Sequence, residues 1–181
     1  IPLLLIFRSS SYGWSVLYGT GFGIIQTMIT NYWLGTFSLI SLQFITIYYG
    51  IIYFLFMLIL VWLLKNSGKL SFLIFALAWT VFDYVRTTGF MGYPWGMLGV
   101  TQYNFLPFIQ LSSITGVWGV SFILYLINGA VTEPILFLRR GFPPGKVLLT
   151  TRKIIIGTGI LFAGIILFGG IRLAVLERSM N

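Results

Sequence analysis

Residues 43–64 read QFITIYYGIIYFLFMLILVWLL and contain no charged side chain. An α-helix needs roughly 20 mainly apolar residues to cross a bilayer, and this stretch is long enough. The strands of a membrane β-barrel alternate apolar and polar side chains, and residues 51–64 do not alternate. Because lipid offers the backbone no hydrogen-bond partners, the segment must be helical. It therefore predicts an all-α integral membrane protein.

Four further segments of the chain have a similar length and apolar character. The sequence predicts a single transmembrane domain over residues 1–181, a bundle of about five complete helices plus a partial N-terminal one. The first seven residues are apolar but stop at Arg8, so we expect them to be the tail of a truncated span. The five complete spans are predicted at residues 11–30, 43–64, 70–87, 116–138 and 154–174.

Composition excludes several classes of protein. Of the 181 residues, 58% are hydrophobic and 8% are charged, against about 25% charged in an average soluble domain. The chain contains no cysteine and no histidine, which excludes thiolate nucleophiles, Ser-His-Asp catalysis and Cys/His zinc sites within it. We therefore expect no catalytic residue, no metal site and no cofactor in this chain.

The distribution of basic residues predicts the orientation in the membrane. Because the net charge of +8 comes from Lys and Arg between the apolar segments, it indicates orientation rather than nucleic-acid binding. Cytoplasmic loops are enriched in these residues, so the side with eight of the eleven should be cytoplasmic and the C-terminus should face outward. The eight are Arg8, Lys65, Lys69, Arg139, Arg140, Lys146, Arg152 and Lys153, and the other three are Arg86, Arg172 and Arg178.

Glycines recur in the first and last complete spans, at positions such as Gly19, Gly23, Gly157 and Gly164. Small residues at such spacing let membrane helices approach closely. We interpret them as packing residues rather than as functional ones.

The polar residues Asp83 and Arg86 stand near the outer end of the span at residues 70–87. Their spacing of three places them on one helical face, where they can pair. A carboxylate inside a membrane is costly unless paired, which makes this pair a functional candidate. A purely structural ion pair that holds the outer loop explains the residues equally well, and the sequence leaves both readings open.

An irregular Gly/Pro/aromatic segment follows at about residues 88–112, on the predicted outer face. It is too rich in glycine and proline for a plain helix and too aromatic for a solvated loop. Irregular backbone at membrane depth is tolerated only against protein or a cavity, so we expect this segment to line one. Single aromatic residues here would also suit the aromatic belt at the membrane surface. The candidate cavity residues are Gly92, Tyr93, Pro94, Trp95 and Gln102.

At this segment the chain resembles the membrane domain of the apolipoprotein N-acyltransferase family. The family pattern has an acidic residue and an arginine ending a helix, a Phe-Pro-Trp-like turn, a glutamine, and a Gly-Val-rich start of the next span. Here Asp83 stands where glutamate is expected and Tyr93 where phenylalanine is usual, and neither change alters the chemistry much. The residues that carry the resemblance are Asp83, Arg86, Gly92, Tyr93, Pro94, Trp95, Gly99, Gln102, Gln110 and residues 116–122.

The resemblance implies a bacterial inner-membrane enzyme that transfers an acyl chain from a phospholipid to the N-terminal amine of lipoproteins. In that family a periplasmic nitrilase-like domain with a Glu-Lys-Cys triad performs the chemistry. The domain would follow residue 181 or lie on a separate chain, so this chain alone should be inactive. Its implied role is to bind and orient membrane lipid and to anchor the catalytic domain, with the C-terminus facing the periplasm.

The resemblance also suggests roles for the candidate residues. Gly92, Tyr93, Pro94 and Trp95 would shape the floor of a lipid entrance, Arg86 would lie near a lipid phosphate, and Gln102 would add a polar lining.

Two alternatives to a piece of an acyltransferase chain stay open. The chain could be a natural membrane subunit or lipid-binding remnant without catalysis of its own. It could also be an unrelated transporter or channel, with Asp83 and Arg86 along a permeation path. The sequence shows no internal repeat of the kind that many transporters contain, which disfavours the second alternative.

Overall fold

The computed structural model describes residues 2–88 and 92–180. Within these residues the regular elements are all helical and no strand is found, so the predicted all-α class is confirmed. Residues 89–91 of the predicted irregular segment lie outside the described part. The elements are α1 (Pro2–Ser9), α2 (Tyr12–Thr30), η1 (Tyr32–Thr36), α3 (Leu39–Asn66), η2 (Gly68–Leu70), α4 (Ser71–Thr87), η3 (Leu98–Gln102), α5 (Leu106–Ile109), α6 (Ser112–Arg139) and α7 (Pro144–Met180).

Three helices of the described chain, α3, α6 and α7, are long and apolar enough to cross a membrane. The predicted spans at residues 11–30 and 70–87 coincide with α2 and α4, which do not meet the same measure. Polar and glycine residues lower the apolar character of α2, and α4 has only 17 residues. The chain is a membrane protein, and the count of five complete spans with a partial one stays a prediction.

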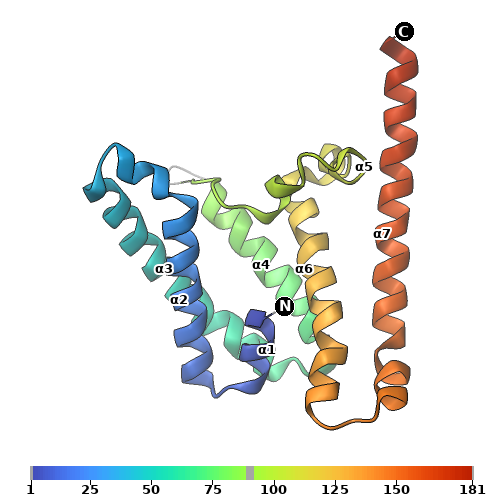
Figure 1. Cartoon of the computed structure of the whole chain (residues 1–181), viewed down its shortest axis with the longest axis horizontal. Coiled ribbons are helices and arrows are strands. Elements are labelled where there is room, and N and C mark those ends of the chain that lie inside the picture. Colours follow the sequence, from blue (N-terminus) through green and yellow to red (C-terminus); the bar gives the residue numbers. More distant parts are fainter. Residues whose placement is uncertain (1, 89–91, 181) are drawn as a thin grey trace.

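The last helix begins earlier than the predicted span at residues 154–174. Proline is favoured at the first position of a helix, and α7 begins at Pro144 and continues for 37 residues. At about 1.5 Å per residue this helix is about 55 Å long, well beyond the ~30 Å of a bilayer core. In Figure 1 its C-terminal part extends past the rest of the bundle.

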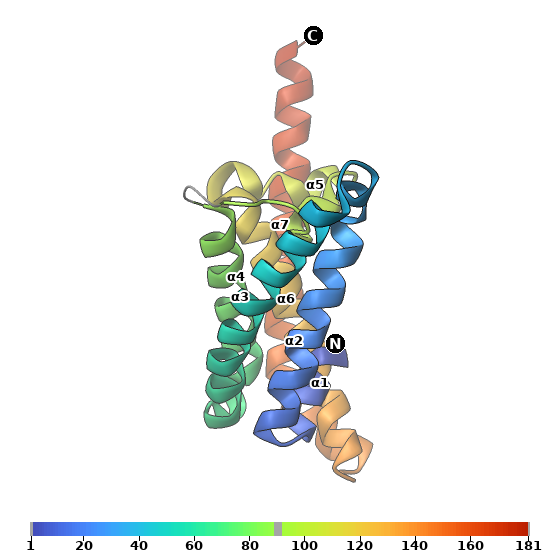
Figure 2. The same ribbon diagram turned by 90° about the vertical axis from the view of Figure 1, so that its left-hand side faces the viewer.

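The bundle has two different ends (Figures 1 and 2). The connections α1–α2, α3–α4 and α6–α7 meet at one end, which we call the basic end. The short elements η1, η3 and α5 gather at the other, which we call the loop end. Of the eight basic residues predicted to share one side, six lie in or next to the three connections, and Arg152 and Lys153 lie in the third turn of α7. The two ends therefore separate basic residues as the sequence predicts.

Glycines let α2 and α3 pack closely. A side-chain carbon added at Gly19 would lie 2.6 Å from the sulfur of Met57, and one at Gly23 would meet the ring of Tyr53. Both partners are buried in the core. The packing interpretation is confirmed at Gly19 and Gly23 of α2, whereas Gly13 and Gly21 of the same helix have no neighbour within 4 Å. In α7 only Gly169 lies against another element, at the carbonyl of Pro107.

A polar cluster at the basic end was missed by sequence reasoning. Glu133 of α6 lies 3.7 Å from the guanidinium of Arg8, which also donates to the hydroxyl of Ser71 and, at 3.2 Å, to the carbonyl of Gly68. Ser71 in turn donates to Glu133 at 2.9 Å. These bonds tie α1 to the α3–α4 turn and to α6, three segments far apart in the sequence.

Candidate functional site

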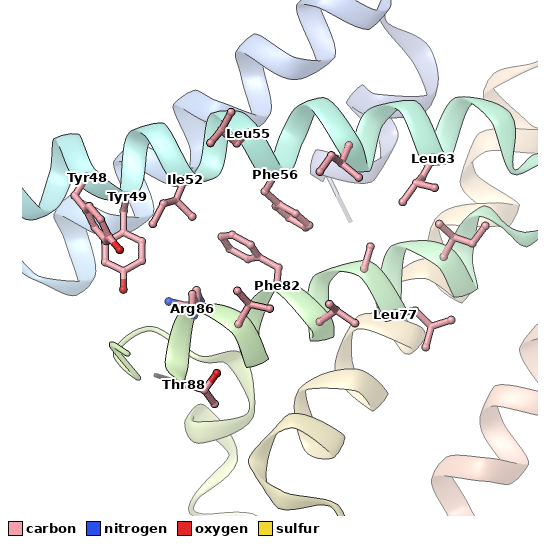
Figure 3. A pocket seen from close by; sticks show the side chains of 15 residues that line it. Tyr48, Tyr49, Ile52, Leu55, Phe56, Leu63, Leu77, Phe82, Arg86 and Thr88 are labelled. Carbon is pink, nitrogen blue, oxygen red and sulfur yellow. The ribbon is translucent and has the colours of Figure 1, made fainter. Parts of the chain in front are cut away.

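A groove of about 700 Å³ lies between α3 and α4. Figure 3 shows the facing side chains of the two helices, with Tyr48, Tyr49, Arg86 and Thr88 at one end and Leu63 and Leu77 at the other. Polar side chains are confined to the loop end, and the rest of the lining is aliphatic or aromatic. The lining residues are Tyr48, Tyr49, Ile52, Leu55, Phe56, Ile59, Leu63, Ile74, Leu77, Ala78, Val81, Phe82, Val85, Arg86 and Thr88.

Aromatic rings form the middle of the groove. Phe56 of α3 stacks on Phe82 of α4 with ring centroids 4.1 Å apart and an interplanar angle of 12°. Phe56 also meets Trp79 edge to face at 5.5 Å. Rigid rings between two helices keep the backbones apart while filling the space behind them. The groove thus has an aromatic back wall and an open side.

The open side faces the surroundings of the bundle. Ile59 on α3 and Val81 and Val85 on α4 are 61%, 59% and 64% exposed. For helices that stand in a membrane, the medium at this depth is hydrocarbon rather than water. The groove is therefore open to the surroundings of the bundle along this side.

Asp83 and Arg86 form a buried ion pair beside the loop end of the groove. Arg86 Nε donates to Asp83 Oδ1 at 2.8 Å, and the two side chains are 6% and 1% exposed. Tyr125 donates to the other carboxylate oxygen at 2.7 Å. A second guanidinium nitrogen, Nη1, donates to the carbonyl of Trp95 at 3.0 Å. Each charge is thus compensated, and the arginine also holds the irregular segment.

The irregular segment is fastened to α2 as well as to α4. The backbone N–H of Tyr93 donates to the carbonyl of Arg86 at 2.9 Å, and the Tyr93 hydroxyl donates to the side chain of Asn31. Gln26 Nε2 donates to the carbonyl of Gly96 at 3.3 Å, where a φ of +77° favours glycine. Burial raises the pKa of the Tyr93 phenol, which keeps it a neutral donor. Residues 92–96 are therefore held in one position.

Aromatic side chains cover this end of the groove. Trp95 is 53% exposed and lies with its ring centroid 5.5 Å from that of Trp33 and 6.4 Å from that of Tyr93. Tyr93 in turn lies 5.8 Å from Tyr49, which lines the groove. The aromatic cluster of Trp33, Tyr49, Tyr93 and Trp95 is thus continuous with the polar end of the groove.

The structure brings most of the predicted site residues together. Tyr93 and Trp95 lie beside Arg86 around a small polar cavity at the ends of α2, α3 and α4, and Gly92 and Pro94 are their chain neighbours. Gln102 is separate: it lies in η3, and its amide donates to Thr101 at 2.9 Å.

Arg86 is engaged by Asp83 and by the carbonyl of Trp95 in this structure. Its contact with a lipid phosphate stays a prediction.

Sequence reasoning missed several residues of the site. Tyr49 and Phe56 stand in a mainly apolar stretch whose sequence does not distinguish one helical face from another, and Phe82 directly precedes Asp83. Gln26 and Asn31 carried a usable signal, because amide side chains near the end of a span need partners. Their bonds to the irregular segment supply those partners.

The chain was compared with known proteins. It is 36% identical over 128 residues to "Apolipoprotein N-acyltransferase 1" of Treponema denticola, covering 71% of this chain and 24% of that protein. It is 34% identical over 112 residues to the apolipoprotein N-acyltransferase of Borreliella burgdorferi, covering 61% and 22%. With that of Rickettsia prowazekii it shares 27% identity over 184 residues, 91% of this chain and 36% of the relative. No solved structure matches significantly.

These comparisons concern one part of longer proteins. The chain spans about a quarter of the length of the Treponema relatives that it matches. Residues 1–130, which include the α3–α4 groove and the aromatic cluster, match the family described as the apolipoprotein N-acyltransferase N-terminal domain. On this match, the chain belongs to the apolipoprotein N-acyltransferase N-terminal domain family.

Proposed function

We propose that this chain is the membrane domain of an apolipoprotein N-acyltransferase, an enzyme that moves an acyl chain from a phospholipid to the N-terminal amine of bacterial lipoproteins. In this proposal the α3–α4 groove binds the phospholipid donor from the side and orients it toward a catalytic domain at the loop end. The observation that carries the proposal is the groove itself, which is apolar along its length and polar only at the end beneath the aromatic cluster.

The distribution of polarity in the groove favours lipid over a water-soluble solute. A path for ions or polar solutes is lined mainly by polar or charged groups, interrupted by short hydrophobic gates. Among the described residues that line the groove, Arg86 is the only charged one, and Asp83 compensates it. Aliphatic and aromatic side chains supply the remainder, which supports a lipid ligand and disfavours the transporter alternative.

The two ends of the bundle support a placement in the bacterial inner membrane. The basic end would face the cytoplasm by the positive-inside rule, and the loop end would face the periplasm. In Figure 1, α7 extends beyond the loop end, on the side of the polar end of the groove. Both features are consistent with a catalytic domain on the periplasmic side, in the same chain or in a separate one.

In this proposal the chain positions the phospholipid donor and does not supply the nucleophile. Acyl transfer through a covalent intermediate needs an activated side chain such as a thiolate, and the chain has no cysteine and no histidine. A nitrilase-like domain would supply the nucleophile and its base. The membrane domain would hold the donor so that its ester bond meets that nucleophile, which lowers the entropic part of the barrier.

A chimera tests this proposal. In the Treponema denticola relative, the matching 128-residue segment and its flanking residues are replaced by the whole of this chain. The purified chimera is then assayed for transfer of a labelled acyl chain from phospholipid vesicles to a diacylated lipopeptide. We expect transfer by the chimera and none by this chain alone.

Two controls make the result interpretable. A chimera with Val81→Trp, which fills the groove, should insert normally and lose most of its transfer rate. A chimera with Ile160→Trp, on an exposed face of α7, should keep it. Normal insertion of the unmutated chimera without any transfer would contradict the proposal and favour a subunit or remnant without a catalytic role.

A further inference from the structure

We infer that a second groove, between α7 and the pair of helices α4 and α6, binds an anionic phospholipid toward the basic end of the bundle. The phosphate of this lipid meets Lys153, and the first part of one acyl chain lies along Gly157 toward Leu161. Among the described residues, the lining of this second groove shares no member with that of the α3–α4 groove. The inference therefore does not rest on the proposed function.

The second groove has a volume of about 330 Å³ and lies where α7 runs beside α6 (Figure 1). Helices α4 and α6 form its back wall. They pack closely there, since a Cβ added at Gly129 of α6 would lie 2.8 Å from the carbonyl oxygen of Phe72. Phe72 lines the groove from this wall, and Lys153, Gly157 and Leu161 line it from α7.

A glycine keeps the α7 side of this groove open. A Cβ added at Gly157 would have no neighbour within 4 Å, so space remains in front of the helix at this residue. Nearer the loop end, α7 contacts the bundle directly. The carbonyl of Pro107 lies against Gly169, and the ring centroid of Phe162 is 5.4 Å from that of Phe108. Helix α7 is therefore anchored above the groove, and the groove itself stays free for a ligand.

The positive charge around this groove has no counterpart in the protein. Glu133 is already paired with Arg8, and Lys65 donates to the carbonyls of Phe7 and Ser10. An anion from outside the chain would balance the cations that remain. In the described part of the chain, these exposed cations form no ion pair and no side-chain hydrogen bond: Arg139, Arg140, Lys146, Arg152 and Lys153.

The order of charge and apolar surface along α7 matches a phospholipid. Lys153 directly precedes residues 154–168, which contain no charged side chain. The helix rises about 12 Å from Lys153 to Leu161, so the cation lies at head-group level and the rest of the groove extends into the hydrocarbon.

The composition of the lining favours a lipid over a soluble phosphate. Lys153 and Thr158 are its polar side chains, and the remainder is apolar. At about 30 Å³ for a group the size of a methylene, the groove holds about 11 such groups, which is part of one acyl chain. Basic pockets between membrane helices are typical sites for anionic head groups. No carboxylate among the described lining residues would attract the amine of a zwitterionic head group.

Native mass spectrometry of the full chain tests the inference. The protein in a mild detergent is titrated with phosphatidylglycerol or with phosphatidylcholine of the same acyl chains, and the Kd of the first bound lipid is measured. We expect a Kd at least about fivefold lower for phosphatidylglycerol, since each nearby Lys or Arg strengthens the binding of an anionic lipid by about this factor. This preference should shrink as the salt concentration rises, because salt screens the attraction. Glycerol phosphate, which has no acyl chain, should not displace the lipid.

Matched pairs of variants locate the lipid. Lys153→Gln should weaken phosphatidylglycerol binding about fivefold, whereas Arg152→Gln, next to it but outside the lining, should change it by less than about twofold. Gly157→Leu fills the groove and should weaken binding at least about fivefold. Gly159→Leu makes the same change at an exposed position outside the lining and should have no effect. Leucine forms helices better than glycine, so both variants should keep the fold, and circular dichroism checks this.

Three results would overturn the inference. Equal affinities for the two lipids, or equal losses in Lys153→Gln and Arg152→Gln without an effect of Gly157→Leu, would leave only a diffuse attraction to the basic end. Dimers that Gly157→Leu disrupts while lipid binding stays the same would assign the groove to a second copy of the chain. Lipid binding that is lowered by Val81→Trp and not by Gly157→Leu would place the lipid in the α3–α4 groove, which would support the proposed function while this inference fails.

Discussion

Replacing Asp83 by asparagine should destabilise the protein by about 3 kcal/mol, at the lower end of the cost of breaking a buried ion pair. The substitution keeps the shape of the side chain and removes its charge. Arg86 then stays in the core with only 6% of its side chain exposed and no carboxylate to pair with. The asparagine carbonyl can still accept a hydrogen bond from Tyr125, which is why we expect the lower end of the range.

The companion variants test the cause of this loss. Arg86→Gln alone should also cost about 3 kcal/mol, because it leaves a carboxylate at 1% exposure without its partner. The double variant removes both charges, so it should cost less than the sum of the two single changes by at least about 1 kcal/mol. Glu177→Gln, at an exposed position of α7, serves as the control and should stay within about 0.5 kcal/mol of the parent.

Unfolding is followed by circular dichroism while the protein is titrated from mild detergent into sodium dodecyl sulfate. Hydrogen exchange of residues 92–96 gives a second readout, because Arg86 donates to the carbonyl of Trp95 and should release this segment when it loses Asp83. The reasoning is refuted if Asp83→Asn lies within about 1 kcal/mol of the parent, or if the double variant is as unstable as the two single costs combined.

Three further changes probe packing, the basic end and the aromatic cluster. Gly23→Val should destabilise the protein by about 1–3 kcal/mol, because its Cβ collides with the buried ring of Tyr53. A Cβ at Gly21 has no neighbour within 4 Å, so Gly21→Val should destabilise less in the same titration. Glu133→Gln should lower the free energy of unfolding by about 1.5–3 kcal/mol, because Arg8 and Ser71 lose their charged acceptor. Hydrogen exchange in α1 should become faster in this variant, and unchanged exchange there would contradict the role of the Arg8–Glu133 pair. In the chimera, Trp95→Ala should lower kcat/KM for phospholipid about threefold to tenfold through loss of its contacts with Trp33 and Tyr93, and unchanged kinetics would remove Trp95 from the site.

Features set by local sequence could be predicted before the structure. Residues 43–64 are apolar enough to predict a spanning helix by themselves, and α3 is that helix. The spacing of Asp83 and Arg86 within one helix placed them on one face, where they form the ion pair. The segregation of basic residues followed from counting alone, because it depends only on the order of spans and loops.

Features that depend on contacts between distant segments could not be predicted. The groove arises where α3 and α4 stand apart, and an apolar stretch such as residues 51–64 does not reveal which face turns toward a neighbour. The bonds of Asn31 to Tyr93 and of Arg8 to Glu133 join residues 62 and 125 positions apart, and no local pattern links them. The early start of α7 was missed because the basic residues before the apolar run obscured a helix that Pro144 begins.

The central claim, that the α3–α4 groove holds a lipid acyl chain, is tested most directly by photocrosslinking. The protein is reconstituted into vesicles that contain a phospholipid with a diazirine near the middle of one chain, irradiated, and mapped by mass spectrometry. The account predicts crosslinks concentrated at Ile59, Val81 and Val85 over equally exposed residues of α7 such as Ile160 and Leu167, and their loss in Val81→Trp. Crosslinks spread evenly over the exposed faces of α3, α4 and α7 would contradict it.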